Sequence, residues 1–242
     1  MFDYMKAIAI DNLSFAYSDS KPIFAELNLE ILAKEKVGLI GANGTGKTTL
    51  FLLICGILSA KKGKIKIFEK QIEVGKFNPE IGLVFQNPND QLFCSTVRDD
   101  IAFGPENMGL TKEEIDRRVE KALNLTGISP LIDRIPHQLS GGEKSMVAIA
   151  SVIAMQPKII LYDEPSANLD LRARRRLIDF LNLAKETILI SSHDLELILE
   201  VCDRVILLDR TKIVADGITR EIMSNKELME NHSLEVPYSL IL

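Results

Sequence analysis

The segment Gly41–Thr49, which reads "GANGTGKTT", restricts the possible folds of this chain more than any other stretch. It has the spacing G-x-x-x-x-G-K-[ST], follows the apolar run Val37–Ile40 and opens the run Lys47–Leu58. A strand, a glycine-rich turn and a helix in this order surround an anion with backbone N–H groups. The alternative is a glycine-rich turn with an incidental lysine. At average residue usage, the motif arises by chance in roughly one chain of this length in a hundred. The sequence therefore predicts a phosphate-binding loop.

Each residue type in this loop has a chemical purpose. The glycines let successive N–H groups curl around a phosphate, Lys47 brings a positive charge to the β- and γ-phosphates, and Thr48 offers a hydroxyl to Mg²⁺. We therefore expect a nucleotide to contact the whole loop, namely Gly41, Ala42, Asn43, Gly44, Thr45, Gly46, Lys47, Thr48 and Thr49.

Short β-like runs alternate with helical patterns along most of the chain, which predicts an α/β fold with a largely parallel sheet. The front end instead alternates apolar and polar residues over 7–13 and 27–31, so half-buried antiparallel strands are expected there. Further strands are expected at 37–40, 81–85, 159–162, 188–190 and 205–208.

The β signal fades between residues 87 and 156, where helical patterns dominate and Thr111–Glu114 has the form of a capping box. We interpret this stretch as a helical subdomain inserted into the α/β core. The predicted division of the single domain is 1–86 and 158–224 for the nucleotide-binding core, 87–157 for the helical subdomain and 225–242 for a C-terminal tail.

Bulk composition excludes several classes of protein. A net charge of −5 and a pI near 5.4 argue against general binding to nucleic acid or to anionic lipid. The three cysteines are far apart and form no C-x-x-C pair, so they are expected to be reduced thiols of a cytosolic protein. Apolar runs such as Val147–Met155 are far shorter than the roughly 20 residues of a membrane span.

Two carboxylates, Asp163 and Glu164, follow the apolar run in "IILYDEPSANLD". An isolated Asp-Glu pair at this place is more often a polar end to a strand. In a chain that also has a phosphate-binding loop, one carboxylate is suited to hold Mg²⁺ and its neighbour to polarise an attacking water. The second carboxylate favours a hydrolase over a kinase.

A second glycine motif, "LSGGE", opens the long apolar helix predicted after Ser140. Ser140 is a suitable N-cap, and the free N–H groups beside it form another anion site. By itself the motif is more simply read as a capped helix. Two phosphate sites far apart in one chain suggest instead a nucleotide sandwiched between two protomers.

In order along the chain, "GANGTGKT", a lone Gln86 after a strand, "LSGGE", "IILYDEP", "SANLD" and "SSHD" resemble the nucleotide-binding subunits of ABC transporters. The resemblance spans nearly the whole chain. It implies a P-loop NTPase of the ABC ATPase type, with a RecA-like core, an antiparallel β subdomain and an inserted helical subdomain. It also implies ATP and Mg²⁺ as ligands, and an ATP hydrolase coupled to transmembrane transport.

The family's roles transfer to matching positions of this chain. The implied catalytic residues are Glu164 as general base, His193 as the switch histidine on the γ-phosphate, and Gln86, which reaches Mg²⁺ and the attacking water. Thr48, Gln86 and Asp163 are the implied metal ligands.

The family also implies roles around the nucleotide base and the dimer interface. Tyr17 matches the aromatic residue that stacks on adenine, although a buried tyrosine at a strand end is the alternative. The implied contacts to the ATP of a second subunit are Ser140, Gly141, Gly142 and Glu143, and Asp170 matches an aspartate at the dimer interface. His137 and His232 match no family motif.

The chain departs from the family pattern at a few positions. Glu143 stands where glutamine is commoner, and Ser145 and Met146 replace residues that are usually basic. The arginines at 172 and 174–176 are most simply a solvated helix face. None of these changes removes a phosphate or metal ligand, so an active ATPase is expected.

The segment "GLVFQNPNDQLFCSTVRDDIAFGPENMGL", 82–110, resembles the energy-coupling factor group of importers for vitamins and for cobalt or nickel. Leu92 and Phe93 look exposed beside polar turn residues, which suits a docking site for a transmembrane coupling subunit. The alternative is that one or both fold back onto the helical subdomain.

The expected partners are that coupling subunit, a membrane substrate-binding subunit and a second ATPase subunit, either identical or paralogous, with no nucleic acid. The expected location is the cytoplasmic face of the membrane, as a peripheral subunit. The alternative functions are an ATPase of another ABC transporter class or a soluble ABC ATPase. A P-loop kinase or GTPase would lack the family's signature motif, which here is "LSGGE" at 139–143.

Overall fold

The computed structural model describes residues 5–18, 21–167 and 169–241. The remaining positions of the predicted domain ranges, 1–4, 19–20, 168 and 242, lie outside the described residues. Internal contacts divide the chain into two compact units, 1–78 with 185–242 and 79–184. This division groups 79–86 and 158–184 with the helical segment, whereas the sequence analysis assigned both ranges to the core.

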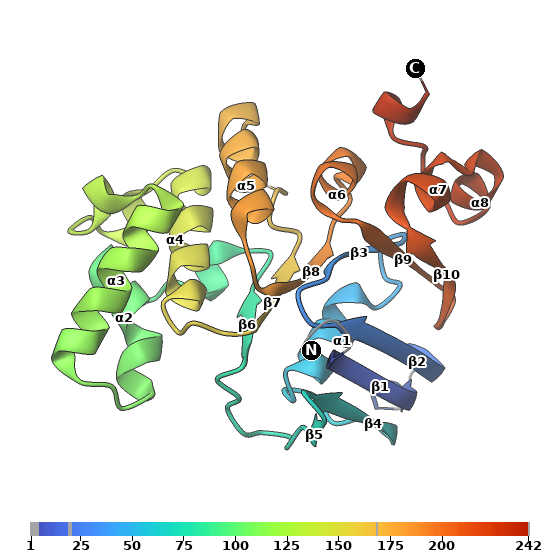
Figure 1. Cartoon of the computed structure of the whole chain (residues 1–242), viewed down its shortest axis with the longest axis horizontal. Helices are drawn as coiled ribbons and strands as arrows, with labels where there is room; N and C mark the ends of the chain where they lie inside the picture. The colour runs from blue at the N-terminus through green and yellow to red at the C-terminus, as the bar shows by residue number, and fades with distance from the viewer. Residues whose placement is uncertain (1–4, 19–20, 168, 242) are drawn as a thin grey trace. The chain divides into compact units, whose positions relative to one another are not determined.

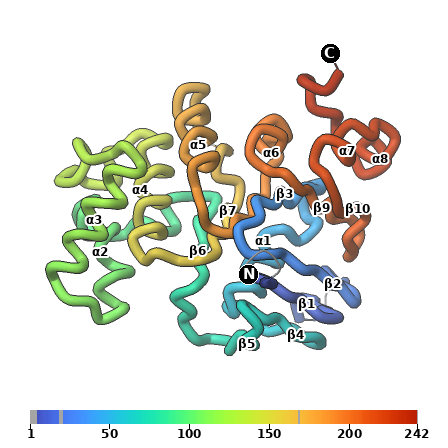
Figure 2. The backbone as a smooth tube through the Cα atoms, in the orientation of Figure 1, coloured from blue at the N-terminus to red at the C-terminus, as the bar shows by residue number. Residues whose placement is uncertain are grey.

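In the first unit, the predicted front-end strands form an antiparallel sheet in the order β2-β1-β4-β5 (Figure 2). Its strands are β1 (Lys6–Phe15), β2 (Phe24–Leu32), β4 (Lys62–Ile67) and β5 (Lys70–Gln71). The first two were predicted. The second two were not, because β4 reads "KGKIKI" and buries only Ile65 and Ile67.

The same unit contains a parallel group of strands with β3 (Lys36–Ile40) at its centre. This strand pairs in parallel with β8 (Thr187–Ser191) on one side and β9 (Arg204–Asp209) on the other, and β10 (Lys212–Ile218) pairs antiparallel with β9. Every residue of β8 is buried, as expected for a central parallel strand.

Helix α1 (Lys47–Ile54) follows the phosphate loop but ends earlier than the predicted run to Leu58. Gly56 has φ +70, and the N–H of Ile57 bonds back to the carbonyl of Leu52 at 2.9 Å. A left-handed glycine followed by this backward bond is a common helix stop, which explains the shorter helix.

The described part of the C-terminal tail, 225–241, packs within the first unit through helices and side-chain contacts. The remaining helices of this unit are α6 (Leu195–Val201), α7 (Thr219–Ser224), α8 (Lys226–Asn231) and the short 3₁₀ turn η4 (Tyr238–Leu240). His232 Nδ1 lies 2.8 Å from Asp209 Oδ2, and Ser239 donates from its N–H and Oγ to Glu196. The tail is therefore an ordered part of this unit.

In the second unit, β6 (Ile81–Val84) and β7 (Ile159–Asp163) form a parallel pair, and helices occupy most of the chain between them (Figure 1). Helices α2 (Val97–Asn107), α3 (Lys112–Thr126) and α4 (Gly141–Ile153) pack side by side (Figure 1). Three short 3₁₀ turns of the described chain lie in the same stretch, η1 (Pro88–Asp90), η2 (Ser129–Leu131) and η3 (Pro136–Gln138), and α5 (Leu171–Leu183) follows β7.

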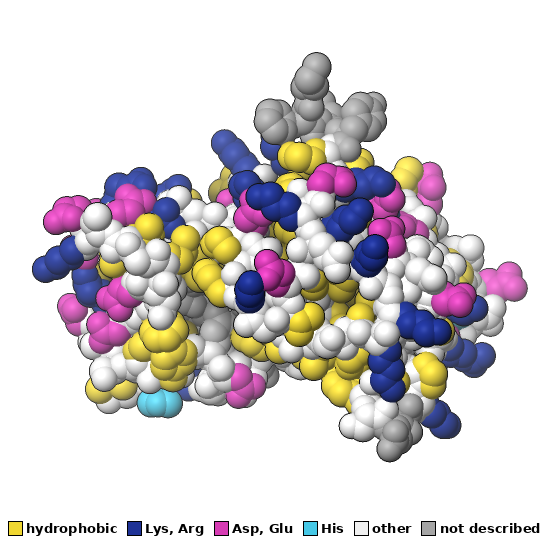
Figure 3. Space-filling view, turned by 90° about the horizontal axis from the view of Figure 1, so that it is seen from below, with side chains coloured by type: hydrophobic (Ala, Val, Ile, Leu, Met, Phe, Trp, Pro, Cys, Tyr) yellow, Lys and Arg dark blue, Asp and Glu magenta, His cyan; other side chains and the backbone are white. Residues whose placement is uncertain are grey.

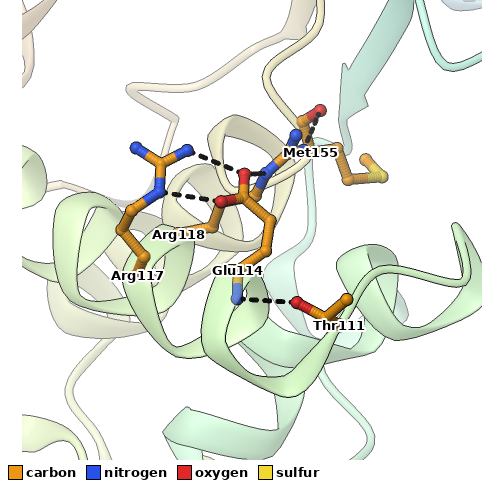
Figure 4. Close-up of polar contacts among 5 residues, drawn as sticks. All are labelled: Thr111, Glu114, Arg117, Arg118 and Met155. Atoms are coloured by element: carbon orange, nitrogen blue, oxygen red, sulfur yellow. Dashed lines mark hydrogen bonds and ion pairs between the residues drawn. The ribbon is translucent and has the colours of Figure 1, made fainter.

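The predicted capping box at the start of α3 is only half formed. Thr111 Oγ1 accepts the N–H of Glu114, but the Glu114 carboxylate accepts hydrogen bonds from Arg117 and Arg118 (Figure 4). These hydrogen bonds, of which the one from Arg117 contributes most, lower the pKa of Glu114 to about 2. Arg118 also donates to the carbonyl of Met155 at 3.1 Å, so the group ties α3 to the end of α4.

Side chains of both charges are interspersed on the face shown in Figure 3, as the modest net charge suggests. Cys55, Cys94 and Cys202 are free thiols. Burial raises the pKa of Cys55 to about 12, so this thiol stays protonated. Over the residues described here, no helix has both the length and the hydropathy needed to cross a bilayer.

Candidate functional site

The phosphate loop needs glycine at two positions for steric reasons. Gly41 has φ +153, and a Cβ there would lie 2.3 Å from the carbonyl oxygen of Leu208. Gly46 has φ +101, and its Cβ would lie 2.6 Å from Ile23 Cγ2. Both positions combine a backbone conformation that L residues rarely adopt with a close neighbour. The loop shape is therefore built into the packing of the first unit.

Lys47 is buried, and its ammonium group lies over the loop that precedes it. Its Nζ donates to the carbonyl of Gly41 at 2.8 Å and approaches that of Ala42 at 3.2 Å. Thr45 Oγ1 donates to the same Ala42 carbonyl at 3.0 Å. These contacts hold a positive charge within the curl of the loop, where the sequence predicts the phosphates.

His193 lies beside this lysine, with Nε2 3.5 Å from Lys47 Nζ. The two residues are 146 positions apart, and the sheet explains their proximity. Since β3 and β8 are adjacent parallel strands, their carboxyl ends meet at one edge, where ligands of open α/β sheets bind. Asp194 caps α6 by accepting the N–H of Leu197 at 3.0 Å, which fixes the turn that contains His193.

Tyr17, which follows β1, lies close to the first turn of α1 and to the phosphate loop. Its hydroxyl is 3.2 Å from Thr49 Oγ1, and its ring meets that of Phe15 edge to face at 4.9 Å. The side chain is 44% exposed, so the alternative of a buried strand-end tyrosine is wrong. An exposed aromatic ring at this place has the chemistry to stack on a nucleotide base.

In the second unit, the predicted acidic residues and the lone glutamine follow two paired strands. Val84 of β6 lies opposite Tyr162 of β7, so Gln86 and Glu164 each follow that pair by two residues. Asp163 and Glu164 are only 4% and 7% exposed. The parallel pairing therefore brings Gln86 and the carboxylates to the same edge of this unit.

Glu164 has an unusual backbone conformation for a residue with a side chain, with φ +48. A left-handed non-glycine residue costs about 1–3 kcal/mol, and such strain is often found at functional positions. The N–H of Ala167 bonds to the carbonyl of Glu164 at 3.1 Å and helps to hold the turn. The strain is not readable from sequence, because glutamate gives no local signal for positive φ.

Ser140 caps α4 as predicted, within a complete capping box. Its Oγ accepts the N–H of Glu143 at 3.3 Å, and Glu143 accepts the Ser140 N–H at 2.8 Å. The Ser140 hydroxyl and N–H lower the pKa of the Glu143 carboxyl, with smaller contributions from Arg134 and Arg176. The spacing S-x-x-E was a readable signal for this box. Glu143 is therefore a charged cap beside the free N–H groups of the helix.

Gly142 has a packing role in addition to its place in the motif. A Cβ on it would lie 2.9 Å from Ala173 Cβ on α5. The start of α4 therefore approaches α5 closely. Asp170 caps α5 by accepting the Ala173 N–H at 2.7 Å, a local role that the sequence analysis did not assign.

The two apolar residues of the predicted docking segment have different surroundings. Leu92 is 3% exposed, so the expectation that it faces solvent is wrong, and the fold-back alternative holds for it. Phe93 is 63% exposed and meets Phe103 edge to face, with ring centroids 4.8 Å apart. Phe103 is itself 45% exposed, so the two phenylalanines form an exposed aromatic pair.

Asp100, which the sequence analysis missed, fixes Phe93 to α2, the helix that contains Phe103. The carboxylate is buried, and its Oδ1 accepts the N–H groups of both Phe93 and Cys94 at 3.0 Å. Two N–H donors on one buried oxygen hold the chain direction at Phe93. No signal in the sequence points to this role, because the burial of Asp100 and its bonds to Phe93 and Cys94 are evident only in the structure.

The residues proposed to hold Mg²⁺ suit a hard cation bound largely through a nucleotide. Thr48, Gln86 and Asp163 supply hydroxyl, amide and carboxylate oxygens. Within the described part of the chain, no group of three or more His, Cys, Asp or Glu side chains could bind a metal by itself. Mg²⁺ is commonly bound through one or two carboxylates together with waters and substrate phosphates, so this donor set, with its single carboxylate, fits it.

The family model of the ABC transporter matches residues 24–167, which contain the phosphate loop, Gln86, the signature motif and both carboxylates. The chain belongs to the ABC transporter ATP-binding family. Its activity is accordingly ATP hydrolysis coupled to transport, and ATP is its nucleotide.

Relatives of this ABC ATPase cover almost its whole length. A Synechocystis protein named as an ABC transporter ATP-binding protein is 56% identical over 97% of this chain and 82% of its own. The energy-coupling factor transporter ATP-binding protein EcfA of Methanothermobacter thermautotrophicus is 42% identical over 95% of this chain and 76% of its own.

A solved structure supports the fold. The structure of cbiO1 from Clostridium perfringens, described as part of the ABC transporter complex cbiONQ, superposes with a TM-score of 0.83 at 34% identity. The match covers 99% of this chain and 98% of that one. The predicted fold class and the resemblance to the energy-coupling factor group are confirmed.

Proposed function

We propose that this chain is the ATPase subunit of an energy-coupling factor importer, in which two such subunits hold two ATP molecules between them. The support is the identity to EcfA proteins and the likeness to cbiO1. A transmembrane coupling subunit and a membrane substrate-binding subunit complete the importer at the cytoplasmic face of the membrane. The cargo belongs to the vitamin or cobalt/nickel class, and the ATPase pair is homomeric or paralogous.

The observation that carries the ATP-hydrolysing part of the proposal is the position of Lys47 within its loop beside His193. In the proposed reaction, Lys47 and the loop N–H groups bind the β- and γ-phosphates, and Tyr17 stacks on the adenine. A water oxygen forms a bond to the γ-phosphorus while the bond to the β-phosphate oxygen breaks. Glu164 accepts the proton of that water, and ADP and phosphate are released.

The other residues orient the reactants. Gln86 positions the attacking water, His193 contacts the γ-phosphate, and Ser140 to Glu143 of the second subunit cover the same phosphate from the other side. Thr48, Gln86 and Asp163 would hold Mg²⁺, which supplies positive charge to the phosphate oxygens when bound. Closure of the pair would transmit force to the membrane subunits, and hydrolysis would reopen it.

Co-expression with the membrane proteins encoded beside this chain tests the proposed function. We expect a stable complex in detergent and an ATPase rate that differs between the complex and the isolated chain, because docking changes the geometry of the ATPase pair. Pull-down on the tagged chain and phosphate release measure both. ATP hydrolysis without association with any membrane subunit would favour a soluble ABC ATPase instead.

Glu143→Gln should strengthen ATP-driven pairing of two ATPase subunits by a few-fold. Glutamine retains the capping box, while the substitution removes a negative charge from the helix end proposed to meet the γ-phosphate. Light scattering against ATP concentration, in a Glu164→Gln background that prevents turnover, measures the pairing. Glu120→Gln on α3 removes the same charge from an exposed site and is the control. Equal or weaker pairing of Glu143→Gln would contradict the assignment.

A further inference from the structure

The loop that contains Gln86 is closed at its base by the side chain of Gln91. Oε1 of Gln91 accepts the N–H of Phe85, the residue before Gln86, at 3.1 Å. The amide nitrogen of the same side chain donates to the carbonyl of Ala148 at 2.7 Å and to Ser151 Oγ at 3.0 Å. Ala148 and Ser151 both lie in α4, the helix that the signature motif opens and that we call the signature helix. One side chain therefore joins the end of β6 to the signature helix.

The segment between Phe85 and Gln91 is ordered by its own polar contacts. Asn87 Oδ1 accepts the N–H of Asn89 at 3.1 Å, and Asn87 Nδ2 donates to Asp90 at 3.2 Å. The N–H of buried Leu92 donates to the carbonyl of Pro88 at 3.0 Å. Because these bonds link 87–92 into one turn, we expect the turn to move as one body, so that a shift at Gln86 reaches Gln91.

A second contact joins the same loop to α4. Lys144 Nζ donates to Asn89 Oδ1 at 2.8 Å, one residue after the signature motif ends at Glu143. Ser140 and Ala148 are eight residues apart, which corresponds to about 12 Å along a helix. Because a helix of this length is stiff, a displacement at Ala148 also moves its N-terminal end.

Glutamine is suited to this position by its chemistry and its length. Its amide provides one acceptor for Phe85 and two donors for Ala148 and Ser151. Asparagine has the same groups but is one methylene shorter, while glutamate would oppose a carboxylate to the Ala148 carbonyl. Methionine matches the length and volume but cannot make these bonds.

We propose that Gln91 is a positioning residue that makes the Gln86 loop and α4 move together, so that ATP contact at Gln86 shifts the signature helix. This inference rests on the proposed roles of Gln86 and of Ser140 to Glu143. The exposed pair of Phe93 and Phe103 begins two residues beyond Gln91 in the same ordered segment. The side chain therefore lies at the junction of the proposed nucleotide contact, the signature helix and the proposed docking surface.

Gln91→Met and Gln91→Asn test the bridge, with Ser129→Ala as the matched control. Ser129 Oγ donates to Asn124 Oδ1 at 3.0 Å. The control variant therefore removes an exposed side-chain hydrogen bond in the same unit, at a position distant in sequence from Gln91. We expect both Gln91 variants to lower kcat about tenfold and to change the KM for ATP less than twofold, because the phosphate loop is intact. Ser129→Ala should keep the wild-type kcat.

Hydrogen exchange supplies a readout that does not depend on hydrolysis. The Phe85 amide should exchange at least tenfold faster in both Gln91 variants than in the wild type. ATP should change exchange in 86–90 and in 141–145 together in the wild type, and only in 86–90 in Gln91→Met. A wild-type kcat in Gln91→Met, or unchanged Phe85 exchange, would overturn the inference. If the wild-type protein showed no ATPase activity, the proposed function would be refuted. The comparison of hydrogen exchange between wild type and variants would still test the role of Gln91.

Discussion

Replacement of Glu164 by glutamine is expected to lower ATP turnover by about 10²–10⁴-fold while ATP still binds. The amide has the shape of the carboxylate but cannot accept the proton of the attacking water. The residue is 7% exposed and has φ +48 directly after β7. With binding preserved and hydrolysis blocked, the ATP-bound pair of subunits should accumulate.

Phosphate release, a fluorescent ATP analogue and size-exclusion chromatography measure the three parts of this prediction. Asp179→Asn is the control, because it makes the same change from acid to amide on an exposed face of α5 in the same unit. Asp163→Asn should differ from Glu164→Gln by weakening Mg²⁺-dependent ATP binding. Turnover within tenfold of wild type in Glu164→Gln would rule out its assignment as the base.

Phe93→Glu should abolish association with the transmembrane subunit while the isolated chain stays folded. Phe93 is 63% exposed and pairs with Phe103, so a charge there costs little in the free subunit but would be buried at the proposed docking surface. Loss of an aromatic anchor typically costs about 2 kcal/mol or more, a roughly 30-fold weaker complex, and the buried charge adds to this. Basal ATPase activity of the isolated chain should persist.

Co-purification, thermal unfolding and ATPase assays separate the effects. Leu92→Glu should behave differently and lower the unfolding temperature, because Leu92 is 3% exposed and belongs to the core. Leu125→Glu is the control for a charge on an exposed apolar position of the same unit, since Leu125 is 55% exposed. A complex of Phe93→Glu as stable as wild type would show that the aromatic pair is not the docking site.

The contrast between Leu92 and Phe93 illustrates a limit of pattern reading. Adjacent residues in an irregular segment have no period from which burial can be inferred. The N–H of Leu92 bonds to Pro88 while that of Phe93 bonds to Asp100, and these two bonds turn the side chains to different surroundings. Strand β4 was missed for a related reason, because its lysines hide an alternating pattern of only two buried isoleucines.

Local chemistry alone determined the phosphate loop, the capping serine of α4, the carboxylates after β7 and the family, because each depends on residue types at short, fixed spacing. Tertiary structure decided what depends on distant partners. The parallel pairing of β3 and β8 brings His193 to Lys47, the turn after β7 forces Glu164 into a left-handed conformation, and α4 supplies the acceptors for Gln91. Such partners are set by strand order and helix packing, which no short stretch of the chain specifies.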